Sequence, residues 1–250
     1  MKKISAFLVL LTLMLGGPPP PAQAQLMINE LNGFNSSASA APPVITFLQC
    51  STSNPTGTNP YTFASQNVGT ASGDRYTLVG LATEDAATAF SVSSVAVNGD
   101  AATLVVDEGG TQLASAAFFI LFNPAGTSED VIVTMSEAIS NSSVCLWSIT
   151  GLSSTTATDT ATGNKGGVTT TMTLDVDLSA GGVGAGICGE ENTGRTFTWT
   201  GFTEEVDGNA TGMARSASDY TATVAESGKS VTAKRDGGSG SAGCVTATFR

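Results

Sequence analysis

The chain has 250 residues, of which 10 are Lys or Arg and 21 are Asp or Glu, and its net charge is −11. It contains no histidine, which excludes Ser–His–Asp and Cys–His catalysis, the HExxH zinc motif and haem held by histidine. The negative charge argues against a nucleic-acid partner, because few cations are present to neutralise phosphates.

The first 24 residues have the organisation of a secretory signal. Lys2 and Lys3 precede an apolar run over residues 4–15, and Ala22 and Ala24 fit the small-residue rule of a cleavage site. The run is shorter than the about 20 residues that a membrane-spanning helix needs, and no cysteine follows it for a lipid anchor. The pattern predicts export without a stable membrane anchor. The alternatives are a retained N-terminal helix and a translation start at Met27, which opens the segment MINELNGFN.

Residues 25–60 are rich in Ser, Ala, Pro, Asn and Gly, a composition typical of loops and linkers. Within them, residues 44–48 (VITFL) form a strand-like island. We expect this stretch to be an extended N-terminal arm that contributes one strand to a domain over residues 61–250.

From residue 61 onward, apolar and polar residues alternate with a period of two, which is typical of half-buried β-strands. The alternation is clearest in residues 131–135, 145–149, 172–178 and 196–200. Asn98-Gly99 separates two such segments and predicts a two-residue hairpin turn. Glu108-Gly109-Gly110 marks the next turn.

This pattern predicts an all-β fold with roughly a dozen strands of about 5–9 residues. We expect a single two-sheet antiparallel sandwich, jelly-roll-like, with the extended N-terminal arm. The alternative is two smaller sandwiches in tandem, divided near residues 153–165 (SSTTATDTATGNK), the linker-like segment of the body.

One predicted strand is apolar on both faces, over residues 116–122 (AAFFILF). Such a strand lies in the middle of a sheet that is covered on both sides, or at a contact between subunits. A plain central core strand is the simpler alternative. The candidate residues for self-association are Phe118, Phe119, Ile120, Leu121 and Phe122.

The four cysteines are Cys50, Cys145, Cys188 and Cys244. None belongs to a CxxC pair, which disfavours a zinc ribbon or a thioredoxin-type site. In an oxidising compartment they would form two disulfides, with three alternative pairings. In a reducing cytosol they would remain buried thiols, and the sequence leaves both alternatives open.

Two patterns resemble catalytic or cofactor motifs but have simpler explanations. Gly184-x-Gly186-x-x-Gly189 matches the dinucleotide fingerprint, yet no helix follows to hold a pyrophosphate, and bare glycines suit close packing. The acidic pairs Glu84-Asp85, Glu190-Glu191 and Glu204-Glu205 are sequence neighbours beside turns. We therefore expect solvated turn acids and not the acid pair of a glycosidase.

Two loops offer oxygen ligands for calcium without matching an EF-hand: Asp207-Gly208-Asn209 and Glu190-Glu191-Asn192. Whether a metal binds is left open. Lys234 and Arg235 are expected to be a charge pair at a hairpin turn. We assign no catalytic residue and no cofactor.

Four segments together resemble virion structural proteins of tailed phages, especially marine ones: residues 67–83 (NVGTASGDRYTLVGLAT), 90–105 (FSVSSVAVNGDAATLV), 129–152 (EDVIVTMSEAISNSSVCLWSITGL) and 197–207 (FTWTGFTEEVD). The segment MINELNGFN is similar to that group as well. The resemblance covers most of residues 27–250 and implies a tail-fibre, tail-tip or capsid-decorating role, without catalysis, in symmetric copies. The signal-like leader departs from it, since virion proteins assemble in the cytosol.

The sequence therefore predicts a non-enzymatic structural or surface-display protein located in a phage virion. Its expected partners are other copies of itself, other virion or surface proteins and a host-surface glycan. The alternative is an exported bacterial surface adhesin or glycan-binding module, secreted or on the cell surface, which the leader and the even number of cysteines favour. A secreted carbohydrate-active enzyme is a third hypothesis, based on analogy of fold.

Overall fold

The computed structural model describes residues 41–53, 59–85, 90–109, 113–166, 171–210, 212–237 and 240–250. All of them belong to one compact unit, Ala41–Arg250. The signal-like leader, the MINELNGFN segment and most of the predicted arm lie outside the described residues. Within these ranges the chain forms 19 β-strands and no helix. It follows that none of the described segments is a helix long and apolar enough to cross a membrane.

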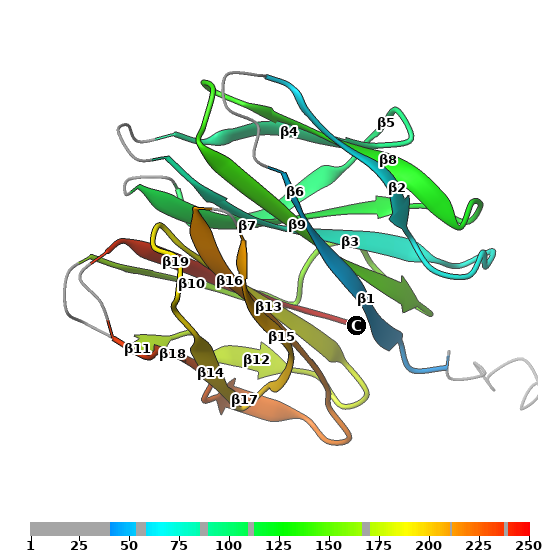
Figure 1. The fold of residues 1–250 in the computed structure, drawn as a ribbon. Helices are drawn as coiled ribbons and strands as arrows, with labels where there is room; N and C mark the ends of the chain where they lie inside the picture. Colours follow the sequence, from blue (N-terminus) through cyan, green and yellow to red (C-terminus); the bar gives the residue numbers. More distant parts are fainter. Residues whose placement is uncertain are drawn as a thin grey trace, which may run out of the picture. The chain divides into compact units, whose positions relative to one another are not determined.

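The first half of the unit forms a sandwich of two antiparallel sheets (Figure 1). Its strands are β1 (Val44–Ser53), β2 (Tyr61–Asn67), β3 (Tyr76–Glu84), β4 (Val92–Val97), β5 (Asp100–Ala101), β6 (Thr103–Asp107), β7 (Ala114–Phe122), β8 (Ser128–Met135) and β9 (Asn141–Thr150). One sheet has the order β1-β9-β3-β7-β6, and we call it the first inner sheet. The other, the first outer sheet, has the order β2-β8-β4-β5.

The second half repeats this arrangement. Its strands are β10 (Asp159–Lys165), β11 (Thr171–Thr173), β12 (Val176–Leu178), β13 (Val183–Glu190), β14 (Phe197–Thr200), β15 (Thr203–Ala210), β16 (Met213–Thr221), β17 (Glu226–Lys229), β18 (Thr232–Arg235) and β19 (Ala242–Phe249). The second inner sheet has the order β10-β19-β13-β16-β15. The second outer layer consists of β11-β18-β14 and the pair β12-β17.

Both halves have jelly-roll topology, in which the chain pairs with itself as a long hairpin that folds over. In the first half, β1 pairs with β9, β2 with β8 and β3 with β7. In the second half, β10 pairs with β19, β11 and β12 with β18 and β17, and β13 with β16. The prediction of an all-β, antiparallel, jelly-roll-like sandwich is confirmed.

We expected a single sandwich of two sheets. The described strands instead form five sheets, arranged as two jelly rolls. Residues 151–158 connect the two jelly rolls, and they overlap the linker-like segment 153–165, whose second part is β10. β1 extends beyond the predicted island VITFL and is the edge strand of the first inner sheet.

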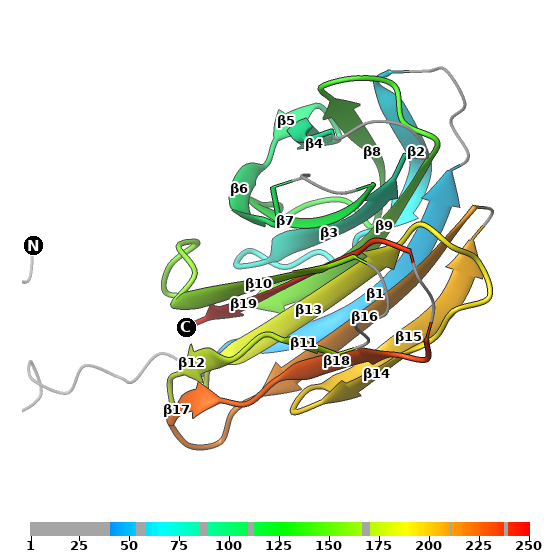
Figure 2. The same ribbon diagram turned by 90° about the vertical axis from the view of Figure 1, so that its left-hand side faces the viewer.

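The sheets lie in four layers, which follow one another from top to bottom in Figure 2. One apolar core fills each sandwich, and a third core lies between the two inner sheets. Trp147 and Phe118 from the first half and Ile187 from the second are fully buried in this central core. Because both inner sheets are covered on both faces, their central strands are buried almost throughout.

This layering explains the doubly apolar segment in β7. Phe118 to Leu121 are at most 8% exposed, with alternate side chains in the first and the central core, whereas Phe122 is 51% exposed. The structure therefore places the segment in a sheet covered on both sides. The alternative, a subunit contact through these residues, retains only Phe122 as an accessible side chain.

The glycines of the apparent dinucleotide motif also have a packing role. A Cβ atom on Gly184 would lie 2.6 Å from the Phe202 ring, and one on Gly186 would lie 2.7 Å from the Trp199 ring. β13 thus presents bare backbone to two aromatic rings of the outer layer, as the packing explanation predicts. The Asn98-Gly99 hairpin is confirmed: both residues have positive φ, 52° and 87°, as a type I′ turn requires.

Candidate functional site

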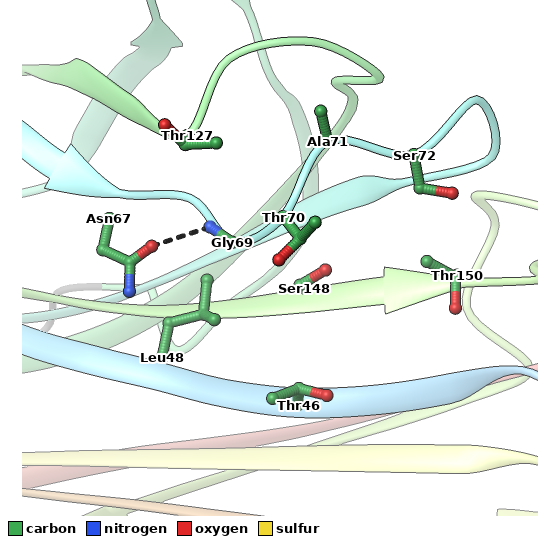
Figure 3. Close-up of a pocket in the computed structure, with 10 residues that line it drawn as sticks. All are labelled: Thr46, Leu48, Asn67, Gly69, Thr70, Ala71, Ser72, Thr127, Ser148 and Thr150. Atoms are coloured by element: carbon green, nitrogen blue, oxygen red, sulfur yellow. Dashed lines mark hydrogen bonds between the residues drawn. The ribbon is translucent and has the colours of Figure 1, made fainter.

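A groove of about 460 Å³ lies on the first sandwich, at the end of the first inner sheet where the outer strands β2 and β8 stop (Figure 3). β1 and β9 form its floor, and residues 67–72 with Thr127 form its wall. The lining side chains belong to Thr46, Leu48, Asn67, Gly69, Thr70, Ala71, Ser72, Thr127, Ser148 and Thr150.

Local backbone geometry brings the wall close to the floor. The side-chain Oδ1 of Asn67 accepts a hydrogen bond of 2.9 Å from the main-chain N–H of Gly69 (Figure 3), which forms a turn of the Asx type. Gly69 has a φ of 88°, and a Cβ there would lie 3.2 Å from the Cβ of Ser148. Only glycine meets both conditions without strain.

Arg75 fixes the wall from behind. Its side chain is fully buried and donates hydrogen bonds to four main-chain carbonyls: Gly69 at 2.8 Å, Asn123 at 2.6 Å, Ala125 at 2.5 Å and Gly126 at 3.0 Å. Burial lowers the pKa of Arg75, and the charge of Glu129 acts in the opposite direction. One cation therefore ties the loop that bears Gly69 to the loop that precedes β8.

The groove is neutral, although the chain carries a net charge of −11. Of its ten lining residues, six carry hydroxyl groups, one carries a carboxamide and none carries a charge. Hydroxyl and carboxamide groups both donate and accept hydrogen bonds. Asp74 lies beside the groove; the hydrogen bond that it accepts from the Ser72 hydroxyl lowers its pKa.

The acidic residues that we expected to be solvated lie partly in the interior. Glu84 is 4% exposed and accepts a hydrogen bond from the Asn141 side chain. Burial raises the pKa of Glu84, and the negative charges of Asp85 and Glu191 raise it further. The structure thus brings two of the predicted acidic pairs close to each other, one from each sandwich. The expectation of solvated turn acids is wrong for Glu84, Asp85 and Glu190, because they end strands that are covered on both faces.

Glu190 and Arg235 form a buried ion pair in the second sandwich. Glu190 Oε1 lies 3.0 Å from Arg235 Nη1, and both side chains are 0% exposed. Burial raises the pKa of Glu190, whereas the charges of Arg235 and Arg195 lower it. The expected charge pair of Lys234 and Arg235 at a hairpin turn is therefore wrong for Arg235, since strand alternation leaves Lys234 exposed and turns Arg235 inward.

A third acidic feature joins β15 and β16. Glu205 occupies a β-bulge between Glu204 and Val206 and interacts with Asp219 on the neighbouring strand. Burial raises the pKa of Asp219 to about 7, and the charge of Glu205 and a hydrogen bond with it act in the same direction. Asp219 therefore holds its proton up to near neutral pH.

The cysteines form two disulfides, Cys50–Cys145 and Cys188–Cys244. Each links residues that lie directly opposite each other on neighbouring strands, β1 with β9 and β13 with β19. The disulfide alternative is confirmed over the free-thiol alternative. Paired cysteines of this kind are typical of proteins from an oxidising, extracellular or secreted environment.

Each candidate calcium loop has oxygens that make other contacts, and in the Glu190-Glu191-Asn192 loop Glu190 Oε1 pairs with Arg235. Asp207 Oδ1 accepts a hydrogen bond from the N–H of Phe197, and Asn209 Oδ1 accepts from those of Gly194 and Arg195. Across the described ranges, no group of three or more Asp, Glu, Cys or His side chains is arranged to hold a metal ion.

The fold and the disulfides define a class, a double jelly roll with one disulfide inside each half. Comparison of the sequence with known protein families and with curated proteins found no match.

Sequence reasoning missed the groove, because its residues come from four separate segments and are mostly Ser and Thr, which are abundant throughout the chain. Two local signals were available: the Asn67-x-Gly69 spacing of a side-chain-capped turn, and the lone Arg75 at the start of an apolar strand. Neither signal shows that β1 and β9 pass beneath this turn.

Proposed function

We propose that this chain is a non-enzymatic structural protein displayed on a surface, and that the surface is a phage particle, as a tail-fibre, tail-tip or capsid-decorating component. The observation that carries the proposal is the stacking of two jelly rolls on a shared apolar core. Jelly rolls recur in viral capsid proteins, and the resemblance of residues 67–83, 90–105, 129–152 and 197–207 to virion proteins supports the same role.

The shared core makes the two jelly rolls one rigid block. Leu78, Phe118 and Trp147 from the first inner sheet and Ile187 and Val245 from the second are at most 1% exposed. Separating the halves would expose all of them to water, at about 1.5–3 kcal/mol for each large apolar side chain. A rigid block of this kind suits a structural component whose two halves keep a fixed arrangement.

The surface chemistry fits a module in repeated copies. The net charge of −11 opposes non-specific aggregation, while the inner sheets end in edge strands, β1 and β6 in the first and β10 and β15 in the second. Edge strands carry unpaired main-chain groups and are ready sites for contacts between copies. We expect self-association through these edges, measurable by light scattering at micromolar concentration.

Mass spectrometry of purified particles from the source tests the virion role. The proposal predicts this chain in the particles at a constant ratio to the major capsid protein after density-gradient purification. A chain found only in the soluble medium, with none in the particles, contradicts it.

The two disulfides favour a second candidate function, an exported surface adhesin or glycan-binding module. Disulfides persist in oxidising compartments and are rare in the cytosol, and the signal-like leader agrees with export. N-terminal sequencing of the full-length gene product separates the two candidates. A mature start at Gln25 supports export, and a start at Met1 or Met27 refutes it.

A further inference from the structure

We propose that the groove between β1, β9 and residues 67–72 binds a neutral carbohydrate of one or two sugar rings. This inference deepens the second candidate function, since it names the ligand class and the site of a glycan-binding surface protein. It is carried by an internal comparison: the chain contains two jelly rolls with the same topology, and the inner-sheet end that bears the groove in the first is covered in the second.

In the second jelly roll, the matching end of the inner sheet is covered. Thr246 and Thr248 of β19 point into the second sandwich and are fully buried. Their hydroxyls are satisfied by carbonyls of the covering segment: Thr246 donates to Leu174 O at 3.2 Å, and Thr248 donates to Asp177 O at 2.8 Å. The strand pair β12-β17 provides part of this cover.

In the first jelly roll, none of the described residues covers this face, and the hydroxyls remain. Ser148 and Thr150 follow the core residue Leu146 on the same face of β9. The outer strands stop at the pair Asn67 and Ser128, so none of the described strands forms a pair there that corresponds to β12-β17. Within the described part of the chain, the hydroxyls of Ser148 and Thr150 have no protein hydrogen-bond partner.

The groove is held open in advance of binding. Arg75 and the Asn67–Gly69 turn hold the wall by main-chain hydrogen bonds, and the floor belongs to two paired strands that the Cys50–Cys145 disulfide also joins. A site whose walls need no reordering loses less free energy on binding than a flexible loop does.

The lining chemistry selects the ligand class. The groove hydroxyls of Thr46, Ser148 and Thr150 match the donor and acceptor pattern of sugar hydroxyls, and Leu48 and Ala71 offer apolar contact to the C–H face of a ring. A groove without cations in a protein of net charge −11 disfavours acidic sugars. The volume of about 460 Å³ lies in the range of small-ligand sites.

The test is a ¹H–¹⁵N correlation NMR titration of the disulfide-intact protein. The probes are D-glucose, D-galactose, D-mannose, N-acetyl-D-glucosamine and maltose, with N-acetylneuraminic acid as the anionic comparison. We expect at least one neutral sugar to shift the amide signals of residues 67–72 and 146–150 in a saturable way. N-acetylneuraminic acid should cause a smaller shift.

A double variant, Thr46→Val with Ser148→Ala, removes two floor hydroxyls that have no partner within the described chain. It should weaken sugar binding at least about tenfold and leave the melting temperature unchanged, because each lost ligand hydrogen bond weakens binding several-fold. The matched control is Thr162→Val, an exposed threonine on β10, the first strand of the second jelly roll. Its sugar affinity should equal that of the wild type.

Three results would overturn the inference: no saturable shift with any neutral sugar in the folded protein, equal affinity in the double variant, or preference for N-acetylneuraminic acid. N-terminal sequencing keeps the two proposals apart. A mature start at Gln25 with no sugar binding refutes the groove proposal alone. Sugar binding by a protein that starts at Met27 refutes export alone.

Discussion

The buried ion pair between Glu190 and Arg235 predicts an asymmetric response to substitution. Glu190 ends β13, Arg235 ends β18, and their side chains are 0% exposed. Arg235 also donates a hydrogen bond of 2.7 Å to the carbonyl of Gly240. Replacing Arg235 by Met therefore leaves a buried carboxylate without its cation, which we expect to lower the free energy of unfolding by about 3–5 kcal/mol at pH 8.

The double variant Glu190→Leu with Arg235→Met removes both charges together. Its free energy of unfolding should lie within about 1 kcal/mol of the wild type or exceed it, because an apolar pair of similar volume avoids the cost of desolvating two ions. The single variants Glu190→Leu and Arg235→Met form a double-mutant cycle with the double variant. Its coupling energy measures the interaction between the two side chains.

The loss in free energy of unfolding caused by the single substitution Arg235→Met should also depend on pH. Burial already raises the pKa of Glu190, and Arg235 is the largest opposing influence. Without it, the pKa in the folded state rises further above the unfolded value, so the folded protein binds the proton more tightly. The deficit should shrink as the pH falls from 8 to 5, because the carboxyl group then becomes neutral.

Urea unfolding followed by tryptophan fluorescence at pH 5 and pH 8 measures these free energies. The control is Lys229→Met, which removes the cation of a partly exposed pair with Glu226 at 2.8 Å and should cost about 1 kcal/mol or less. The reasoning is refuted if Arg235→Met loses less than about 1 kcal/mol at pH 8, or if its deficit is the same at both pH values.

Three further predictions address other parts of the molecule. Replacing Cys188 and Cys244 together by Ser should lower the free energy of unfolding by about 4 kcal/mol, measured by denaturant titration, since the bond closes a long loop; an unchanged midpoint contradicts this. The pKa of Asp219 is raised to about 7 from 3.8, so its proton favours the folded state and stability should fall as pH rises through 7; melting curves of Asp219→Asn should show a weaker decline. Arg75→Met should lower the melting temperature and broaden the amide signals of residues 67–72, because four main-chain carbonyls lose their hydrogen-bond donor. Sharp, unshifted signals there would refute the anchoring role of Arg75.

Local patterns were enough to predict much of the secondary structure. Met172, Leu174, Val176 and Leu178 are buried while the residues between them are exposed, as their alternation predicted. Asn98-Gly99 forms its hairpin because few other dipeptides tolerate two consecutive positive φ values. These features depend on neighbours within a few residues, so the sequence by itself determines them.

Which strands become neighbours depends on contacts between distant segments. The four cysteines allowed three pairings, and only the registers of β1 with β9 and β13 with β19 select Cys50–Cys145 and Cys188–Cys244. The burial of Glu84 and Glu190 likewise follows from a second sheet against each strand end, which no local pattern reveals. A short acidic pair beside a turn has the same sequence pattern whether water or another sheet covers it.

In the groove too, local sequence determines one feature and contacts between distant segments determine another. Alternation within β9 is sufficient to place Ser148 and Thr150 on the face of Leu146. Whether that face is filled, as β12-β17 helps to fill the second jelly roll, or left open, as in the first, depends on where the outer strands end in space. The sequence alone determined strands, turns and an all-β sandwich, because these arise from short-range periodicity. The tertiary structure alone decided the stacking of two jelly rolls, the disulfide pairing and the open hydroxyl-lined end, because these arise from contacts between residues up to about a hundred positions apart.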